Sequence, residues 1–188
     1  MLKLMSVVAL AAMTTVANAA VLNFEGATSS SDIGTTDFVN DNFGVLSDPC
    51  TTYAGATGYC FGGTDGPAVA YNGFGTAATL TSTIGEFDLQ GFYATAAFVD
   101  GQSFLFEGLL GGSVVFSDTR SLSNTTPAWI ALNFSGIDAF RVSAVGAPTW
   151  IAIDEFTYSA VSGVPLPASL PLALAGAGAL AFVSRRRA

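Results

Sequence analysis

Two short segments that contain acids, one near the start and one near the end of the chain, hold the residues best suited to form a site. They are the NFE segment at residues 23–25 and the IDEF segment at residues 153–156. Apolar residues occupy both alternating positions around Asp154 and Glu155, so each carboxylate has apolar neighbours whichever face of a strand is inward. A buried carboxylate must be hydrogen-bonded, ion-paired or metal-bound, because an isolated charge is too costly to remove from water. Alternatively, Asp154 caps a turn or faces solvent.

The rest of the sequence offers little catalytic chemistry. The chain contains no histidine and two cysteines, so the base of a serine hydrolase and the ligand set of a zinc site are both missing. Two carboxylates can hydrolyse a glycoside, and Glu107, Asp118 and Asp138 are further candidates, but a domain with 14 acids always offers such pairs. We therefore predict that the protein is not an enzyme, with a secreted glycan-active hydrolase as the alternative.

The strands that would position these residues are short and separated by turns rich in glycine. Apolar segments recur from residue 67 onward, with no helical period, and this spacing favours an all-β fold, a jelly-roll-like sandwich. The expected strands are Val21–Glu25, Asp37–Val39, Phe43–Leu46, Ala68–Tyr71, Ala77–Thr83, Glu86–Gln90, Phe92–Val99, Ser103–Leu109, Ser113–Asp118, Ala128–Phe134, Ile137–Val145 and Trp150–Tyr158.

Alternation within these segments indicates which residues face the core. Ile130, Leu132 and Phe134 share one face of their strand, and the apolar phase slips after Gly91, which suggests a bulge. The 15 phenylalanines are expected to fill the layer between two sheets. A sugar-stacking surface would use tryptophan and tyrosine, and the spacing does not indicate which of these are exposed. The candidates are Trp129, Trp150, Tyr53, Tyr59, Tyr71, Tyr93 and Tyr158.

Cys50 and Cys60 are separated by nine residues. In an exported protein an even number of cysteines indicates a disulfide, here one that ties down a long loop. A metal site would need more ligands than these two thiols. We therefore predict a Cys50–Cys60 disulfide.

Residues 1–19 have the features of a secretory signal peptide. Lys3 supplies a positive charge, residues 4–16 are mostly apolar, and Ala17-Asn18-Ala19 is a small-x-small cleavage site. Cleavage after Ala19 and removal of the C-terminal tail leave residues 20–163 as one domain. Its two basic and 14 acidic residues give a formal charge of −12. A surface this acidic excludes nucleic acid as a partner.

The ends of this domain, VLNFEG and WIAIDEFTY, resemble those of jelly rolls of the carbohydrate-binding-module type. The resemblance implies a structural calcium ion held by an acid of the first strand, matching Glu25, and an acid of the last strand, matching Asp154. Calcium prefers six to eight oxygen ligands. Backbone carbonyls or the loop acids Asp37 and Asp41 would complete the shell.

The last 25 residues, from Val164 to Ala188, contain an apolar span and a basic end. No residue from Leu166 to Val183 is charged, and these 18 residues would span about 27 Å as a helix. Arg185, Arg186 and Arg187 follow, and such a cluster keeps its end of a membrane helix in the cytoplasm. The preceding domain would then lie outside. An ordinary single-pass anchor is the alternative to a processed tail.

This tail consists of a pentapeptide, the apolar span and the arginine cluster, in that order. The arrangement resembles the PEP-CTERM sorting tail in its VPLPA variant. The pentapeptide consists of Val164, Pro165, Leu166, Pro167 and Ala168. The resemblance implies export across the inner membrane of a Gram-negative bacterium, with signal peptidase and a membrane-embedded exosortase as processing partners. It implies a transient membrane anchor through the C-terminal helix, then a place at the cell surface or outside the cell. Organisms with such tails often make exopolysaccharide.

These observations predict a non-catalytic β-sandwich that serves as a surface or extracellular-matrix (biofilm) component, with polysaccharide as its candidate ligand. The glycan-active hydrolase remains one alternative. A structural matrix subunit that self-associates is the other.

Overall fold

The structure is a computed structural model that describes residues 18–29, 31–53 and 57–161. Most of the predicted signal peptide and the whole predicted sorting tail, including Val164–Ala168 and Arg185–Arg187, lie outside the described residues. Within the part that is described, no helix is both long enough and apolar enough to cross a membrane.

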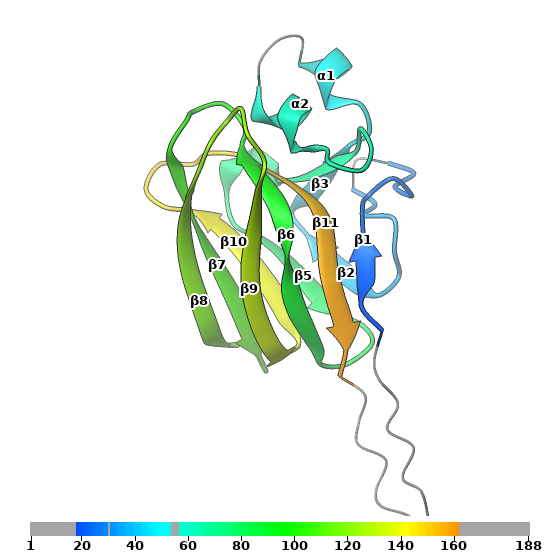
Figure 1. The fold of residues 1–188 in the computed structure, drawn as a ribbon. Coiled ribbons are helices and arrows are strands. Elements are labelled where there is room, and N and C mark those ends of the chain that lie inside the picture. Colours follow the sequence, from blue (N-terminus) through cyan, green and yellow to red (C-terminus); the bar gives the residue numbers. More distant parts are fainter. Residues whose placement is uncertain (1–17, 30, 54–56, 162–188) are drawn as a thin grey trace, which may run out of the picture.

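The described strands form two antiparallel sheets packed face to face (Figure 1). Sheet A contains, in spatial order, β3 (Phe43–Leu46), β4 (Val69–Asn72), β11 (Ile151–Ala160), β6 (Phe87–Ala96) and β9 (Ala128–Ile137), with β1 (Ala20–Leu22) paired to β11. Sheet B contains β2 (Phe38–Asp41), β5 (Ala78–Ser82), β10 (Ala139–Ala144), β7 (Gln102–Leu110) and β8 (Ser113–Leu122). The predicted all-β sandwich is confirmed.

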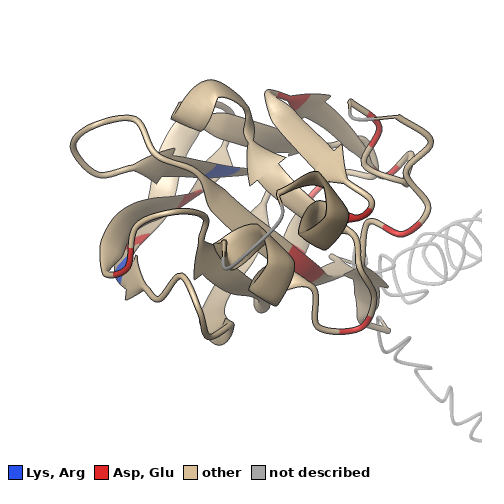
Figure 2. Ribbon diagram, turned by 90° about the horizontal axis from the view of Figure 1, so that it is seen from above, with Lys and Arg blue, Asp and Glu red and all other residues tan. Residues whose placement is uncertain are grey.

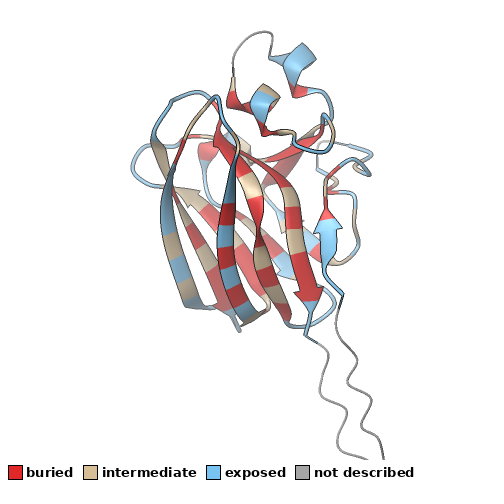
Figure 3. Ribbon diagram, in the orientation of Figure 1, coloured by how far each residue is buried: buried red, intermediate tan, exposed pale blue. Residues whose placement is uncertain are grey.

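Phenylalanine rings fill the space between the two sheets. Phe92 of β6 lies 5.2 Å from Phe106 of β7 and 5.3 Å from Phe140 of β10, measured between ring centroids, and all three are fully buried. Ile130, Leu132 and Phe134 of β9 are buried together, as their alternation predicts (Figure 3). The core is therefore made by large aromatic side chains contributed from both sheets.

The first and last described strands lie side by side. Ala20 of β1 pairs with Tyr158 of β11, so the described sandwich begins and ends at the same pole (Figure 1). This adjacency is the arrangement expected for a jelly roll. It places the beginning of β1 and the end of β11 opposite the end of the molecule that carries the helices.

Two expectations about individual elements are wrong. Residues 86–90 and 92–99 do not form separate strands, because β6 runs continuously through Gly91, with register shifts on both of its sides. The slip after Gly91 does mark an irregularity of the ladder, as predicted. The second error concerns helices, since α1 (Pro49–Thr52), α2 (Gly58–Gly62) and a 3₁₀ turn, η1 (Gly73–Gly75), interrupt the strands.

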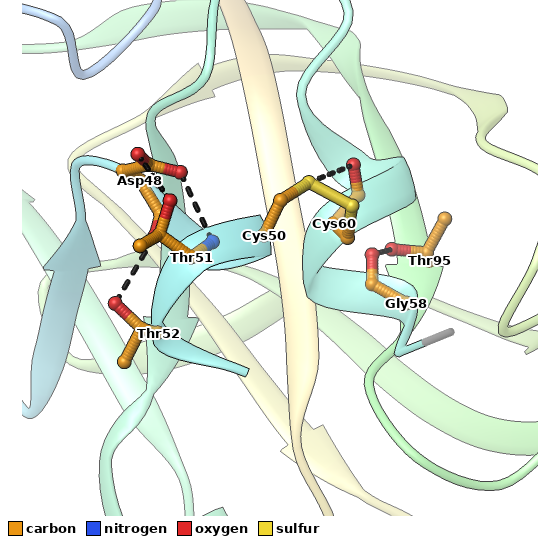
Figure 4. Close-up of a disulfide and its surroundings, with 7 residues drawn as sticks. All are labelled: Asp48, Cys50, Thr51, Thr52, Gly58, Cys60 and Thr95. Carbon is orange, nitrogen blue, oxygen red and sulfur yellow. Dashed lines mark hydrogen bonds between the residues drawn. A yellow bond between two sulfur atoms is a disulfide. The ribbon is translucent and has the colours of Figure 1, made fainter. Parts of the chain in front are cut away.

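The helices α1 and α2 are joined by the predicted Cys50–Cys60 disulfide (Figure 4). Asp48 caps the N-terminus of α1, because its carboxylate accepts hydrogen bonds from the backbone N–H and hydroxyl of Thr51. The helix α2 is fixed to sheet A, because the Thr95 hydroxyl of β6 donates to the Gly58 carbonyl at 2.6 Å. A side chain at Gly58 would place its Cβ 1.7 Å from the Ala96 carbonyl oxygen, so only glycine fits there.

We predict that replacing both cysteines by serine lowers the free energy of unfolding by up to about 3 kcal/mol, the value expected for opening a short loop. The two sheets should persist, because α2 keeps its own hydrogen bonds to β6. Urea unfolding followed by circular dichroism measures both effects. Loss of the β-sheet signal in the variant at low urea would contradict this view of the disulfide as a local tie.

Candidate functional site

Asp154 is fully buried on the outer side of sheet A, with an exposed fraction of 0%. Its Oδ2 accepts hydrogen bonds from the Thr64 backbone N–H at 2.7 Å and from the Thr64 hydroxyl at 3.0 Å. Its Oδ1 accepts from the Glu155 backbone N–H at 2.7 Å. We call Asp154, Thr64 and Glu155 the Asp154 clamp. It fixes the loop of residues 63–68 against β11.

A bulge in β11 positions the clamp. Asp154 pairs with Tyr93, but the next aligned pair is Thr157 with Gly91, so β11 has one residue more than β6 between these points. Glu155 has a φ of 49°, in the left-handed region that residues with side chains seldom adopt. Bulges re-aim side chains and bring backbone groups out of the ladder. Here the bulge turns the Glu155 N–H toward the Asp154 carboxylate.

Glu25 binds the other end of the same loop. Its Oε1 accepts a hydrogen bond from the Ala68 backbone N–H at 2.8 Å. The neighbouring Asn23 donates from Nδ2 to the carboxylate of Asp65 at 3.1 Å. The two acids predicted from the chain ends are therefore brought to one loop, Asp154 at Thr64 and Glu25 at Ala68.

Both oxygens of Asp154 and Oε1 of Glu25 accept hydrogen bonds from donors of the described chain. Among the described residues, no group of three or more acidic, cysteine or histidine side chains is placed to hold a metal ion. Asp41 belongs to β2 in sheet B, and Asp37 accepts a hydrogen bond from the Tyr158 hydroxyl, so neither completes a shell around Asp154. N–H and O–H groups can hold Asp154 and Glu25 in place by themselves. Calcium binding there stays a prediction.

Burial raises the pKa of the Asp154 carboxyl above its ordinary value. The hydrogen bonds from Thr64 and Glu155 oppose this effect, and the nearby carboxylate of Asp65 adds to it. Removal of a charge from water favours its neutral form, and donors that face the charge favour the ionised form. Burial is the larger effect here, so the clamp holds its carboxylate at an electrostatic cost.

An aromatic pair continues the row that Asp154 begins. Asp154 pairs in register with Tyr93 of β6, and Tyr93 pairs with Trp129 of β9. We call Asp154, Tyr93 and Trp129 the outer-face row of sheet A. The rings of Tyr93 and Trp129 meet edge to face, with centroids 5.2 Å apart. Trp129 is 42% exposed, and Ala131, the next residue on the same face of β9, is small and exposed as well.

Gly91 lets the Trp129 ring lie close to the strand. A Cβ at position 91 would lie 3.0 Å from Cζ2 of Trp129 and 2.3 Å from the Ile130 carbonyl oxygen. Gln90, the residue before it, donates from Nε2 to the Ser159 hydroxyl at 3.1 Å, and its Oε1 is buried without a partner among the described residues. An unpaired buried acceptor is normally satisfied by water or a ligand. Gln90 therefore precedes in the chain the glycine against which the Trp129 ring packs.

The positive charges of the described chain lie on the other sheet. Arg141 of β10 is paired with Glu107 of β7 at 2.8 Å, and Arg120 of β8 is paired with Asp118 of the same strand at 2.7 Å. The acids are spread over loops and strands (Figure 2). Because both arginines belong to sheet B, the outer-face row has no basic residue of its own.

An open hollow in the described residues is lined by Gly26, Asp32, Gly34, Thr35 and Thr36. Asp32 accepts hydrogen bonds there from the backbone and hydroxyl of Thr28 and from the Gly34 N–H. The bond from the Thr28 hydroxyl is the main reason that the pKa of this carboxyl falls to about 2. Its acceptors serve the local turn, so the hollow offers a ligand little specific chemistry.

Sequence reasoning singled out Glu25 and Asp154 but missed Thr64, which lies in a polar loop with no distinguishing pattern. It named Trp129 and Tyr93 only as members of a larger aromatic set. Trp129 directly precedes the core residue Ile130 on β9, so alternation directs it to the outer face of the sheet. That alternation is the local signal that could have marked Trp129 as exposed.

We predict that Asp154→Ala lowers the free energy of unfolding by about 1–3 kcal/mol, because it leaves two backbone N–H groups without their acceptor. Thr64→Val is the matched control. It removes only the hydroxyl donor and keeps the backbone bond, so it should cost about 1 kcal/mol or less. Urea unfolding at neutral pH measures both variants.

The pH dependence has a definite sign. The pKa of Asp154 is raised from 3.8, so the folded state holds this proton more tightly than the unfolded state. The stability contributed by this group therefore falls as the pH rises from the unfolded-state pKa through the raised folded-state pKa. Over that pH range, the difference in free energy of unfolding between wild type and Asp154→Ala should narrow. A variant as stable as wild type, or a difference that widens with pH, would contradict the clamp.

The calcium hypothesis predicts a separate result. Calcium should raise the Tm of the domain of residues 20–163, and Asp154→Asn should abolish that rise. Melting curves with calcium and with a chelator test it, with magnesium as the control ion. An unchanged Tm of the wild type in calcium would remove the hypothesis and leave the hydrogen-bonded clamp.

Comparison with known proteins supports the fold. No family model matches the sequence, and no curated protein matches it. The fold is similar to the K2 cleaved adhesin domain of Lys-gingipain, with 13% identity, a TM-score of 0.50 and coverage of 77% of this chain and 98% of that one. The CBM22-1 xylan-binding domain from Paenibacillus barcinonensis Xyn10C matches with 11% identity, a TM-score of 0.48 and coverage of 80% and 99%. These likenesses concern the two-sheet antiparallel β-sandwich.

Proposed function

We propose that this chain is an exported, non-catalytic β-sandwich that binds polysaccharide at the cell surface or in the extracellular matrix. The observation that carries the proposal is the exposed Trp129 ring, held beside Tyr93 on the outer-face row of sheet A. The ligand face is the outer surface of β6 and β9, where that row ends.

A sugar ring presents one apolar face and a rim of hydroxyl groups. Sites for such molecules combine aromatic surface with a small number of placed polar groups. Trp129 and Tyr93 supply the aromatic surface, and Gln90 of β6, a half-buried amide bonded to Ser159, supplies a polar group on the same strand as Tyr93. Strands are rigid supports, so little ordering is needed before a glycan binds.

The signal peptide and sorting tail predicted from the sequence support a site of action outside the cell. We propose that the signal peptide is removed after Ala19 and that an exosortase processes the tail near Val164–Ala168. The described sandwich begins and ends at one pole, so a tail that follows β11 would attach the domain there. The fold is similar to that of an adhesin domain, and this likeness of fold is compatible with the proposed role at the cell surface.

A glycan-active hydrolase finds less support. The three further acids considered for such a hydrolase already have partners in the described structure. Glu107 is paired with Arg141, Asp118 with Arg120, and Asp138 accepts the Gly111 N–H at 2.7 Å. Binding without cleavage is the function that we propose.

We predict that Trp129→Ala weakens binding to the exopolysaccharide of the producing organism by at least about tenfold in Kd, equivalent to about 1.4 kcal/mol. Affinity electrophoresis in gels that contain this polysaccharide measures the change. Phe74→Ala is the matched control, because Phe74 is another aromatic side chain, 85% exposed, on the 3₁₀ turn η1.

Incubation of the protein with the same polysaccharide in solution separates binding from hydrolysis. Retention of wild type in the gel without new reducing ends in solution supports binding, and release of reducing ends would support hydrolysis instead. Equal retention of wild type and Trp129→Ala would refute this ligand face. An equal loss of retention in the Phe74→Ala control would also refute this ligand face, because the effect would then not be specific to Trp129.

A further inference from the structure

The strand β8 is a long, free edge of sheet B. It is the outermost strand of that sheet, next to β7, and pairs only with β7 among the described strands. Outside that ladder, residues 113–121 make no backbone hydrogen bond to another described residue. One side of the strand therefore presents backbone N–H and C=O groups that can pair with another strand.

The features that usually protect an edge are nearly absent from β8. Its sequence, SVVFSDTRSL, has no proline, glycine or lysine, and no residue in it has a positive φ. The other described edges differ. Strands β1, β2 and β3 have three or four residues, and β9 is distorted by Asn133 and Gly136 at positive φ. The ladder of β8 with β7 has one irregularity, a bulge at Val115, and it pairs without a shift from Phe116 to Leu122. Long edge strands with few protective features are the ones that associate.

The sequence of β8 is complementary to itself. In an antiparallel pair about a two-fold axis at Thr119, each residue faces the one that is equally far on the other side of Thr119. Asp118 then faces Arg120 of the second copy, and Phe116 faces Leu122. Opposite charges and apolar residues that face each other across strands are stabilising pairs. The small hydroxyl residues Ser117 and Ser121 face each other as well.

Neighbouring registers lack this complementarity. A two-fold axis at Asp118 or at Arg120 would bring two like charges together. An axis at Ser117 would place Asp118 opposite Phe116. Direct opposition of like charges is destabilising, so the sequence selects the Thr119 register.

The charge of this strand also suits association of an acidic domain. One aspartate and one arginine make β8 locally neutral, although residues 20–163 carry a formal charge of −12. The ion pair within one copy is half exposed at Arg120, with 51% of the side chain accessible. It can therefore be exchanged for two pairs between copies at little cost in desolvation.

We propose that two copies of this chain associate through β8, antiparallel about a two-fold axis at Thr119, so that the two B sheets become one continuous ten-stranded sheet. The partner is a second copy because the strand matches its own sequence in reverse. Such an interface is isologous: Asp118 of each copy contacts Arg120 of the other copy. This proposal does not depend on polysaccharide binding.

The test is sedimentation of the full chain in mild detergent, with Asp118→Arg, Arg120→Asp and a mixture of the two. Wild type should show concentration-dependent dimers. Each variant alone brings like charges together and should dimerise at least about tenfold more weakly. The mixture should regain dimers, because arginines of one variant then face aspartates of the other.

The mixture separates the interface from the fold. Both variants lose the ion pair within the chain, so recovery on mixing can come only from contacts between copies. Monomeric wild type, dimers unchanged in either variant, or a mixture that stays as weak as its components would each overturn the proposal.

A cross-link tests the register. Thr119→Cys should form a disulfide between copies under mild oxidation, because residue 119 faces itself across the axis. Ser113→Cys is the control, since it lies six residues from the axis and faces no copy of itself. Cross-linking at 113 and not at 119 would overturn the register.

Discussion

A carboxylate fully removed from water on the outer side of sheet A constrains the rest of this structure. The Asp154 carboxylate can stay buried because three donors face it, two from Thr64 and one from Glu155. Those donors are available only if β11 bulges at Glu155 and the loop of residues 63–68 folds over the sheet. Glu25 then holds the far end of that loop, so the N-terminal segment follows from the same requirement. Asp154 also pairs in register with Tyr93, and Tyr93 with Trp129, so the clamp and the aromatic pair lie in one row of sheet A.

Local patterns in the sequence were sufficient for the sandwich and its core. Alternation placed Ile130, Leu132 and Phe134 inward, and the cysteine count gave the Cys50–Cys60 disulfide. The helices α1 and α2 were missed because four or five residues are too few to show a 3.6-residue period. The Asp48-Pro49 pair was the available signal, since aspartate caps helices and proline favours their first position.

The candidate site could be predicted only in part. The apolar neighbours of Asp154 required a partner for its carboxylate, but nothing in the sequence identified Thr64, which is 90 residues away in the chain. The Trp129–Tyr93 contact depends on the pairing of β6 with β9, which local alternation does not specify. Registers between distant strands are set by the whole packed fold, so the ligand face became visible only in three dimensions.

The proposed activities use separate parts of one small domain. The ends of the sandwich share one pole, the glycan face lies on sheet A, and the free edge β8 belongs to sheet B. A dimer through β8 would carry two glycan faces without covering either. Two linked sites retain a polysaccharide more strongly than one, because the second contact is intramolecular. Surface attachment and matrix cohesion would then reinforce each other.

The most direct measurement of the central claim is a map of amide and indole NMR shifts in the domain as the organism's exopolysaccharide fragments are added. The account predicts that the largest changes occur at the Trp129 indole and at the amides of Tyr93, Gln90 and their neighbours on β6 and β9. Changes confined to sheet B, around Arg141 and Glu107, or to α1 and α2, would contradict it.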